Sequence, residues 1–204
     1  MKLYGSLTSP FVRKVRAFAM ERGVPFEMVV EDPWQVSPRL IGLNPAGKVP
    51  VLELDDGSLL VESLLIIEYL DTLGDPSGAL IPGAGKARWD ALLWHARAQA
   101  LIDAAVARVL ELRRPENLQM PARVAREEAR FAEVLDFIER SLPDTPWIAG
   151  DAISLGDIML GVALRYTAFR YPHDWEPAHP RLAARLRKLE ARPAIRDTEP
   201  PGFS

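Results

Sequence analysis

Two kinds of sequence periodicity divide this chain near Pro82, and this division constrains its fold more than any other feature. Before that point, short runs typical of strands alternate with runs typical of helices. After it, apolar residues recur only at spacings of three and four, as they do on one face of a helix. The segment between the two parts is rich in glycine and proline, which interrupt regular structure. We therefore predict an α/β domain over residues 1–75, a linker over 76–85 and an all-helical domain over 86–204.

The first domain carries the pattern of a mixed sheet with helices. Ser9 and Pro10 suit the N-cap and first-turn positions of a helix, and Gly23 is suited to end that helix. The turn Asp55-Asp56-Gly57 separates two apolar runs, which favours a β-hairpin. The predicted order is β-α-β-α-β-β-α, with strands over 2–5, 25–30, 49–54 and 58–61 and full helices over 10–22 and 64–73. For residues 32–43 we predict a loop with at most a short irregular helix.

The second domain is predicted to be a helical bundle. Apolar residues mark a long helix over 86–113, another after Pro121, an unusually apolar one over 154–169 and a short last one that Pro193 ends. Ser154 and Asp157 have the spacing of a capping box, in which each side chain satisfies backbone at the start of a helix. Basic residues alternate with leucines on the last helix and predict a solvated face: Arg181, Arg185, Arg187 and Lys188.

Composition excludes several classes of function. The 204 residues include 25 Lys and Arg and 28 Asp and Glu, and this balance gives no field that favours nucleic acid as a partner. The absence of Cys excludes disulfides, thiolate nucleophiles and Cys-ligated metals. The three His lack the spacing of a metal site. No signal peptide or membrane-length apolar run is found, so we expect a cytoplasmic protein with no metal and no membrane partner.

Pro50 lies in a run that otherwise suits a central strand, Val49-Pro-Val-Leu-Glu-Leu54. Proline removes a donor from the strand ladder and is normally excluded there. One interpretation is an edge strand. The other is a cis Val49–Pro50 bond at the start of the strand, which leaves the N–H and C=O of Val49 to pair with an extended peptide.

Two helix starts in the first domain also have two interpretations each. Ser63, with Glu62 before it, is expected to cap the helix that follows the fourth strand; with Glu62 it can also bind an α-amino acid head, Ser63 taking the carboxylate and Glu62 the ammonium. Ser9 can be a plain N-cap. It can also donate its hydroxyl proton to a thiolate, because ligands bind at βα junctions of open sheets.

Three ordered motifs together resemble the glutathione S-transferase superfamily. They are Leu3-Tyr4-Gly-Ser-Leu-Thr-Ser-Pro-Phe-Val-Arg13, Asn44-Pro-Ala-Gly-Lys-Val-Pro-Val-Leu52 and Glu62-Ser-Leu-Leu-Ile-Ile-Glu-Tyr-Leu70. The resemblance extends over essentially the whole chain, because the predicted capping box at 154–157 is similar to that of the family's helical domain. It implies a thioredoxin-like, glutathione-binding first domain, a helical second domain and, as a rule, a homodimer.

The resemblance also implies roles for individual residues. Ser9 matches the catalytic serine of the serine-type classes, tau and theta among them. Val49 and Pro50 match the backbone partner of the cysteinyl moiety and the cis proline after it. Glu62 and Ser63 match the pair that binds the γ-glutamyl end. Lys48 matches a position that reaches the glycyl carboxylate in several classes. Gln99 and Asp103 lie four apart near the expected dimer cleft, where one of them can reach the γ-glutamyl ammonium of the partner subunit or the two can form a structural hydrogen bond. By analogy of fold, the electrophile pocket is lined by Leu7, Phe11, Arg108 and Leu112.

The chain departs from the superfamily pattern at two places. The cysteine-type classes carry Cys where Ser9 stands, so this chain cannot form their mixed disulfide. Tau-type enzymes have a second glycyl-carboxylate lysine at the position of Val36, which leaves that role to Lys48 or Arg39. We therefore expect an enzyme that conjugates glutathione to a small hydrophobic electrophile or reduces a peroxide with it. The alternative is a non-catalytic interaction module with the same fold, such as the stringent-starvation proteins or elongation-factor subunits.

Overall fold

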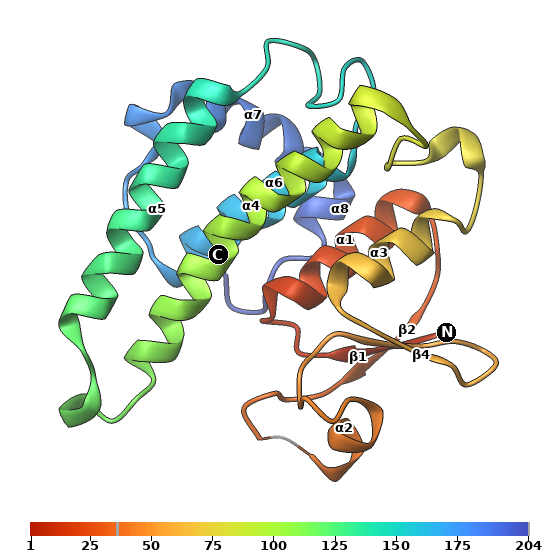
Figure 1. Ribbon diagram of the computed structural model, residues 1–204, viewed down its shortest axis with the longest axis horizontal. Helices are drawn as coiled ribbons and strands as arrows, with labels where there is room; N and C mark the ends of the chain where they lie inside the picture. The colour runs from red at the N-terminus through yellow and green to blue at the C-terminus, as the bar shows by residue number, and fades with distance from the viewer. Residues whose placement is uncertain (36, 204) are drawn as a thin grey trace. The chain divides into compact units, whose positions relative to one another are not determined.

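The computed structural model describes residues 1–35 and 37–203, so the expectation that rests on Val36 lies outside the described residues. The chain forms two compact units (Figure 1). Unit 1 comprises Met1–Ile81 and the C-terminal segment from Arg192 onward; unit 2 is Pro82–Ala191. The break after Ile81 lies inside the predicted linker. The C-terminal segment, which the sequence pattern placed in the helical domain, differs from that expectation because it packs within unit 1.

Unit 1 is built on a four-stranded mixed sheet in the order β2-β1-β3-β4. β1 (Lys2–Gly5) pairs in parallel with β2 (Glu27–Val30) and antiparallel with β3 (Val51–Glu53), which forms a hairpin with β4 (Leu59–Val61). The parallel pair requires a crossover, and α1 (Pro10–Arg22) provides it.

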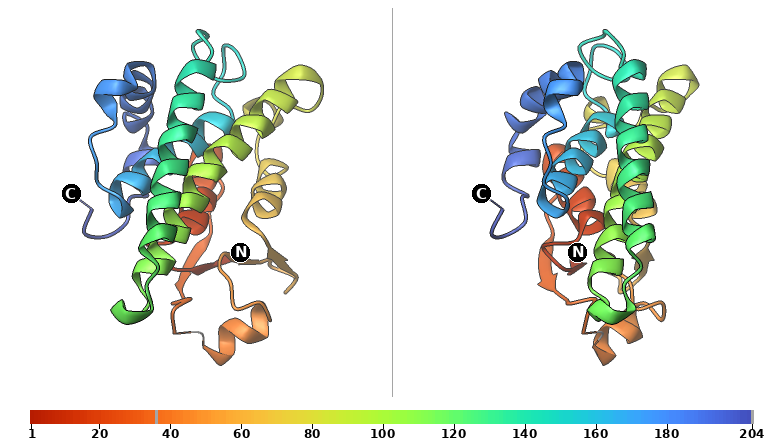
Figure 2. Two further views of the ribbon diagram at one scale, coloured as in Figure 1. Left: turned by 60° about the vertical axis from the view of Figure 1, so that its left-hand side comes forward. Right: turned by 90° about the vertical axis from the view of Figure 1, so that its left-hand side faces the viewer.

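Helices cover both faces of this sheet. α1 and α3 (Ser63–Asp71) pack against each other on one face, and α2 (Pro38–Leu43) lies on the other, as the views in Figures 1 and 2 agree. Gly5 allows α1 to approach closely, because a Cβ at this position would lie 2.3 Å from Cγ2 of Val12. On the opposite face, Leu40 of α2 packs on Tyr4 and Val51.

The C-terminal segment packs against α1. It contains the short helix α8 (Pro193–Arg196), whose Ile195 is fully buried. The guanidinium of Arg13, itself fully buried in α1, donates to the carbonyl of Ile195 at 2.8 Å and to Thr198 Oγ1 at 3.4 Å. Apolar burial and these hydrogen bonds explain why a segment so distant in sequence belongs to unit 1.

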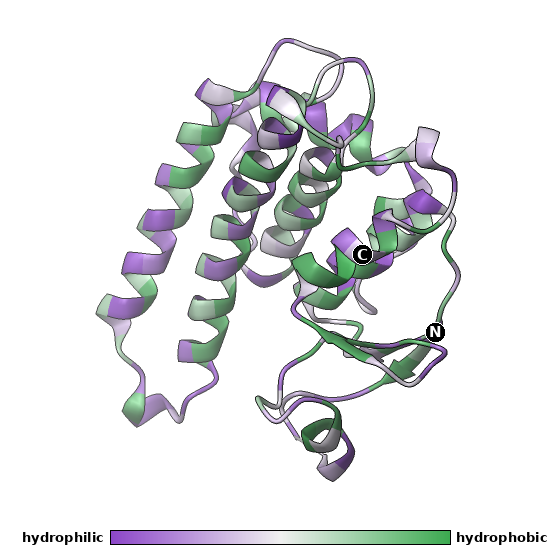
Figure 3. Ribbon diagram, turned by 45° about the vertical axis from the view of Figure 1, so that its right-hand side comes forward, coloured by the Kyte–Doolittle hydropathy of each residue, from purple (hydrophilic) through white to green (hydrophobic). Residues whose placement is uncertain are grey.

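Unit 2 is a bundle of four helices. They are α4 (Gly85–Leu112), α5 (Pro121–Ser141), α6 (Leu155–Arg170) and α7 (Pro180–Glu190). α6 packs on α4 and is buried along most of its length. α5 is amphipathic, with apolar and polar residues on different sides (Figure 3), and it buries Phe131, Leu135 and Ile138. Short 3₁₀ helices are η1 (Pro76–Gly78), η2 (Glu116–Leu118) and η3 (Glu176–Ala178).

The structure confirms the predicted fold class, a thioredoxin-like α/β unit followed by an all-helical one. The segment expected to be mostly loop contains one regular helix, α2, because Ser37 accepts a hydrogen bond from the N–H of Leu40 and Pro38 fits the first turn. Across 1–35 and 37–203, no helix combines the length and the apolar character needed to cross a bilayer.

Candidate active site

The strand pairing brings separate segments of unit 1 to one edge of the sheet. Val51, the first residue of β3, lies opposite Tyr4 of β1 on one side and opposite Val61 of β4 on the other. The chain therefore leaves β1, enters β3 and leaves β4 at the same edge. The three motifs singled out in the sequence follow or precede these strand ends, so they meet there.

Ser9 lies at the N-cap of α1, at the positive end of that helix. Its Oγ accepts a hydrogen bond from the N–H of Val12 at 3.4 Å, and its side chain is half-buried. A hydroxyl has one donor proton and two acceptor lone pairs. Capping uses a lone pair of the Ser9 oxygen, so its O–H group can still donate a hydrogen bond to a ligand. The loop before it carries two further hydroxyls, Ser6 Oγ and Thr8 Oγ1, which lie 3.1 Å from each other.

The Val49–Pro50 peptide bond is cis, as one of the two sequence interpretations predicted. Val49 precedes β3 and packs against the cluster formed by Tyr4, Leu40 and Val51. Among the described residues, no hydrogen bond is found to the backbone N–H or C=O of Val49. The backbone of Val49 thus has the properties that pairing with an extended peptide requires.

The loop before Val49 presents Lys48 to solvent. The carbonyl of Lys48 accepts a hydrogen bond from the side-chain amide of Asn44 at 2.9 Å, which closes the loop. Arg39, the other residue proposed for the glycyl end, forms an ion pair with the buried carboxylate of Glu31 and lies 5.9 Å from the ring centroid of Tyr4. Arg39 is thus engaged within unit 1, and the assignment of the glycyl carboxylate to Lys48 or Arg39 stays a prediction.

Glu62 has an unusual backbone. Its φ of 75° is the only positive φ of a non-glycine residue in the described part of the chain. Side chains with a Cβ rarely adopt this region, and residues held there are often part of functional sites. The carboxylate of Glu62 accepts a hydrogen bond from the N–H of Leu64 at 2.9 Å. Glu62 is therefore the N-cap of α3, and the prediction that Ser63 fills this position is wrong.

Ser63 is instead the first residue of α3 and is buried. Its Oγ accepts a hydrogen bond from Lys14 Nζ of α1 at 2.9 Å and lies 3.4 Å from Glu62 Oε1. Glu62 and Ser63 therefore make different contacts at the start of α3. Glu62 caps the helix, and Ser63 keeps its hydroxyl beside the free N–H groups of the first turn.

Lys14 lies beside this pair and was not singled out by the sequence analysis. It is 1% exposed, and lysines are almost never fully buried unless they are paired. Its signal in the sequence is weak, because a basic residue between Arg13 and Val15 resembles any polar position of an amphipathic helix.

The residues assigned to an electrophile pocket belong to different units. Leu7 and Phe11 are half-buried in unit 1. In unit 2, Leu112 is exposed, and the guanidinium of Arg108 donates to Glu128 Oε1 at 2.7 Å and lies 4.4 Å from the ring centroid of Tyr171. The contacts of Arg108 therefore hold the C-terminal half of α4 in place. A pocket lined by residues of both units stays a prediction.

Gln99 and Asp103 are neighbours on α4, and Gln99 Nε2 donates to Asp103 Oδ1 at 2.7 Å. Asp103 is exposed, so its carboxylate can also be reached by another molecule. Their assignment to a contact with a partner subunit stays a prediction. In the described part of the chain, no group of three His, Cys, Asp or Glu is arranged to hold a metal ion.

The capping box of α6 is confirmed and has a structural role. Asp157 is fully buried and accepts hydrogen bonds from the N–H groups of Ile148 and Ser154, each at 3.0 Å. Burial raises the pKa of the Asp157 carboxyl, while these hydrogen bonds and the charge of Arg185 act in the opposite direction. Arg185, expected on a solvated face, is buried because it donates to Asp157 at 3.2 Å and to the carbonyl of Thr145 at 2.9 Å.

Comparison with known proteins assigns the family. The model of the glutathione S-transferase N-terminal domain matches residues 8–73, and that of the C-terminal domain matches residues 121–184. The GST-like protein YibF of Escherichia coli, described as uncharacterized, is 32% identical over 202 residues, which cover 98% of this chain and 99% of that protein. The chain belongs to the glutathione S-transferase family. A glutathione S-transferase of Hyoscyamus muticus is 30% identical and covers 95% of both chains.

Solved structures of other family members have closely similar folds. A glutathione S-transferase from Methylobacillus flagellatus, described with glutathione bound, is 37% identical with a TM-score of 0.91, over 98% of each chain. One from Methylobacterium radiotolerans, in complex with glutathione sulfonate, is 34% identical with a TM-score of 0.89, over 98% of this chain and 94% of that one. This member of the family therefore shares its fold with relatives whose structures hold glutathione or its sulfonate.

Proposed function

We propose that this glutathione S-transferase binds glutathione along the described edge of the unit 1 sheet and uses its thiolate to attack a small hydrophobic electrophile. The observation that carries the proposal is the meeting of three segments at that edge: the N-cap of α1 with Ser9, the backbone of Val49, and the Glu62-Ser63 pair. The glutathione named in the descriptions of similar structures supports the same ligand.

Each part of the tripeptide has a complementary group in unit 1. The backbone of Val49, which follows an exposed loop, would pair with the cysteinyl residue. The carboxylate of Glu62 would attract the γ-glutamyl ammonium, and the hydroxyl of Ser63 with the first N–H groups of α3 would hold the carboxylate beside it. Lys48 would meet the glycyl carboxylate in solvent.

Ser9 would stabilise the thiolate. Its hydroxyl, whose proton is not used in capping, would donate a hydrogen bond to the thiolate sulfur. The positive end of α1 would stabilise the same negative charge. Both interactions favour the charged form of the thiol, so they would lower its pKa from about 8.5 toward neutrality. Catalysis would then consist of a larger thiolate fraction and correct positioning of the sulfur.

The thiolate would react in one of two ways. With a carbon electrophile, the sulfur lone pair forms the S–C bond and the leaving group departs with its electron pair. With a peroxide, the sulfur attacks the terminal oxygen, the O–O bond breaks, and the alkoxide departs with the electron pair and takes up a proton from water to become an alcohol. A second glutathione then converts the resulting glutathione sulfenic acid to glutathione disulfide and water. Both routes need the Ser9-stabilised thiolate and neither needs a protein thiol.

A binding and turnover experiment tests this proposal against a purely binding role for the fold. The protein is applied to immobilised glutathione and eluted with free glutathione, and initial rates are then measured with a panel of electrophiles and peroxides. We expect retention, specific elution and glutathione-dependent turnover of at least one compound. Failure of retention, together with no detectable binding of free glutathione by calorimetry, would contradict the proposal and favour the interaction module.

A further inference from the structure

The contact between Lys14 and Ser63 buries a lysine ammonium against a serine hydroxyl, which the packing of two helices alone does not require. Lys14 lies on α1 five residues after Ser9, and Ser63 begins α3. Each side chain is 1% exposed, and Lys14 Nζ lies 2.9 Å from Ser63 Oγ. Nζ also lies 5.8 Å from the ring centroid of Phe11. The ammonium of Lys14 is thus hydrogen-bonded to the Ser63 hydroxyl, which the proposed function assigns to a ligand carboxylate.

The hydrogen-bond direction in this contact is fixed by chemistry. An ammonium has three donor protons and no acceptor, so the oxygen of Ser63 must accept from Lys14. The hydroxyl proton of Ser63 is therefore directed to a different partner. In the structure that partner is Glu62 Oε1, at the long distance of 3.4 Å, while the Glu62 carboxylate already accepts from the N–H of Leu64. The weak bond to Glu62 can be exchanged for one to a ligand without leaving either group unsatisfied.

We propose that Lys14 is a positioning residue for the α-carboxylate of the γ-glutamyl moiety. This inference rests on the proposed function. Lys14 makes Ser63 a donor toward the ligand, and its ammonium provides the opposite charge at short range. A carboxylate oxygen bonded to Ser63 Oγ would lie within about 6 Å of Nζ, because two hydrogen bonds in series join the atoms. At that distance, in partly buried surroundings, the attraction is much stronger than in water.

The test compares two ligands by calorimetry. One is glutathione; the other has 4-aminobutanoyl in place of γ-glutamyl and so lacks only the α-carboxylate. We expect wild-type protein to bind glutathione more tightly by about tenfold or more. In Lys14→Met, affinity for glutathione should fall about tenfold, while affinity for the analogue should change less than about threefold. The preference for glutathione is therefore lost.

Arg13→Met is the matched control. Arg13 is the neighbouring buried cation of α1, and its contacts include Ile195 and Thr198. We expect this variant to be less stable but to keep the wild-type preference between the two ligands. If both substitutions weaken both ligands equally, Lys14 only holds α1 to α3 and the inference is wrong. If the wild type itself does not distinguish the ligands, the Glu62-Ser63 receptor of the proposed function is wrong.

A measurement on the wild-type protein keeps the inference testable should Lys14→Met fail to fold. The ¹³Cε and ¹⁵Nζ resonances of Lys14 are followed during titration with each ligand. We expect glutathione to shift them and the analogue to leave them nearly in place. Equal shifts with both ligands, or none with glutathione at saturation, would overturn the assignment.

Discussion

We propose that the carboxylate of Glu62 has two tasks at the start of α3. It accepts the N–H of Leu64, which caps the helix, and it is exposed, so its charge can attract a ligand ammonium. The positive φ of Glu62 turns the chain from β4 into α3 at this residue. The two tasks depend on different properties, since capping needs an acceptor oxygen and ammonium binding needs the negative charge.

Glu62→Gln and Glu62→Ala should separate these tasks. Glutamine keeps an acceptor oxygen for Leu64 but loses the charge, so glutathione affinity should fall by about 1.5–3 kcal/mol with little change in stability. Alanine should lose a similar amount of affinity and also about 1 kcal/mol of folding stability, because the cap is removed. Calorimetry and urea unfolding give the two quantities. Unchanged affinity in both variants would show that the γ-glutamyl receptor lies elsewhere.

Ser63→Ala should affect both affinity and stability, unlike Glu62→Gln. Its hydroxyl would bind the ligand carboxylate, so affinity should again fall by about 1.5–3 kcal/mol. Removal of the hydroxyl also takes an acceptor from the buried ammonium of Lys14, which should cost about 1–3 kcal/mol of folding stability. Calorimetry measures the affinity of this variant and urea unfolding its stability. An unaltered stability would contradict the contact between Ser63 and Lys14.

At the scale of elements, α1 depends on a segment far away in sequence. Ser9 is its N-cap, the buried Arg13 and Lys14 lie in its first half, and Gly23 in the left-handed region caps its end. α8 and the residues after it provide the acceptors for Arg13. The position of α1, whose N-cap is Ser9, therefore depends in part on contacts with the C-terminal segment.

Truncation after Ala191 tests this dependence. It removes the fully buried Ile195 and the acceptors of Arg13, so unit 1 should lose about 3 kcal/mol or more of stability. A chain that ends after Pro200 keeps these contacts and serves as the control. We expect the midpoint of thermal unfolding to fall in the chain that ends after Ala191 and to stay unchanged in the chain that ends after Pro200. Equal midpoints for both truncations and the full chain would contradict the role of α8.

The junction between α4 and α5 should show a defined pH dependence. Glu111 is buried and accepts from the N–H of Met120 at 2.7 Å; this hydrogen bond, aided by Arg114 and Arg123, lowers the pKa of its carboxyl from the ordinary 4.5. The stabilisation is complete above the unfolded-state pKa and is lost as pH falls through the lower folded-state pKa. The stability difference between wild type and Glu111→Gln should therefore be constant near neutrality and shrink below pH 4.5. Urea unfolding across that range measures it, and a difference that grows with acidification would contradict the sign.

Local signals in the sequence were sufficient for most elements but not for the contacts between them. The spacing of three and four predicted α4, and Gly23 and the Ser154–Asp157 pair marked helix ends that the structure confirms. Burial of Lys14 and Arg185 could not be predicted, because their partners lie on other elements. The same holds for the placement of the C-terminal segment in unit 1.

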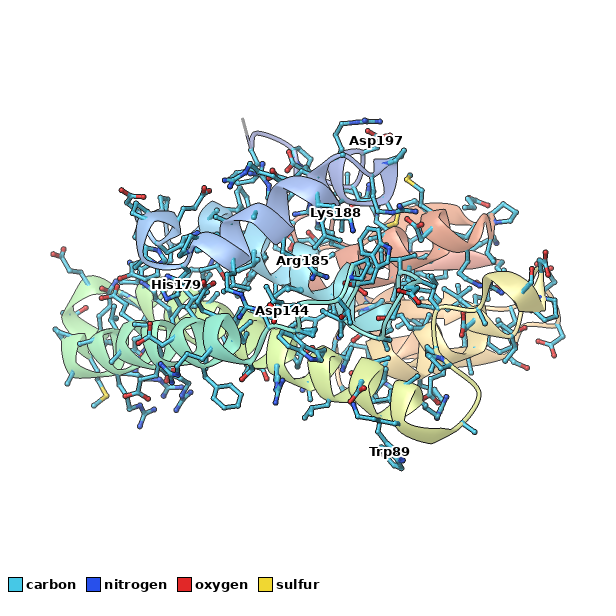
Figure 4. All side chains as sticks on the ribbon, turned by 90° about the horizontal axis from the view of Figure 1, so that it is seen from above. Trp89, Asp144, His179, Arg185, Lys188 and Asp197 are labelled. Atoms are coloured by element: carbon cyan, nitrogen blue, oxygen red, sulfur yellow. The ribbon has the colours of Figure 1, made fainter. Side chains whose placement is uncertain are left out.

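At the scale of the whole molecule, we propose a homodimer. Trp89 of α4 is 70% exposed and projects outward (Figure 4), and Leu93, one turn later, is exposed as well. Exposed apolar residues at this spacing favour an interface. Trp94 of the same helix, by contrast, is buried within unit 2 and packs close to Gly156, so it does not belong to this surface.

Light scattering tests the dimer. The chain has a mass of 22.7 kDa, so we expect about twice that value for the wild type and a shift toward the monomer mass in Trp89→Glu, which places a charge on the apolar surface. Lys86→Glu, an exposed change on the same helix, should leave the mass unaltered. A monomer mass for the wild type at micromolar concentration would contradict the proposal.

The central claim is that Ser9 stabilises the thiolate of bound glutathione, and the pKa of that thiol measures it most directly. Ultraviolet absorbance of the thiolate is titrated against pH in glutathione complexes of the wild type and of Ser9→Ala. We expect the substitution to raise the thiol pKa by about one to two units, which lowers the thiolate fraction and kcat near pH 7 about ten- to hundredfold while KM for glutathione changes little. Activity of the variant should recover as the pH rises past the new pKa. Coincident titration curves with unchanged turnover would contradict the claim; Ser9 would then be only a helix cap, and Ser6 or Thr8 would be the next residues to test.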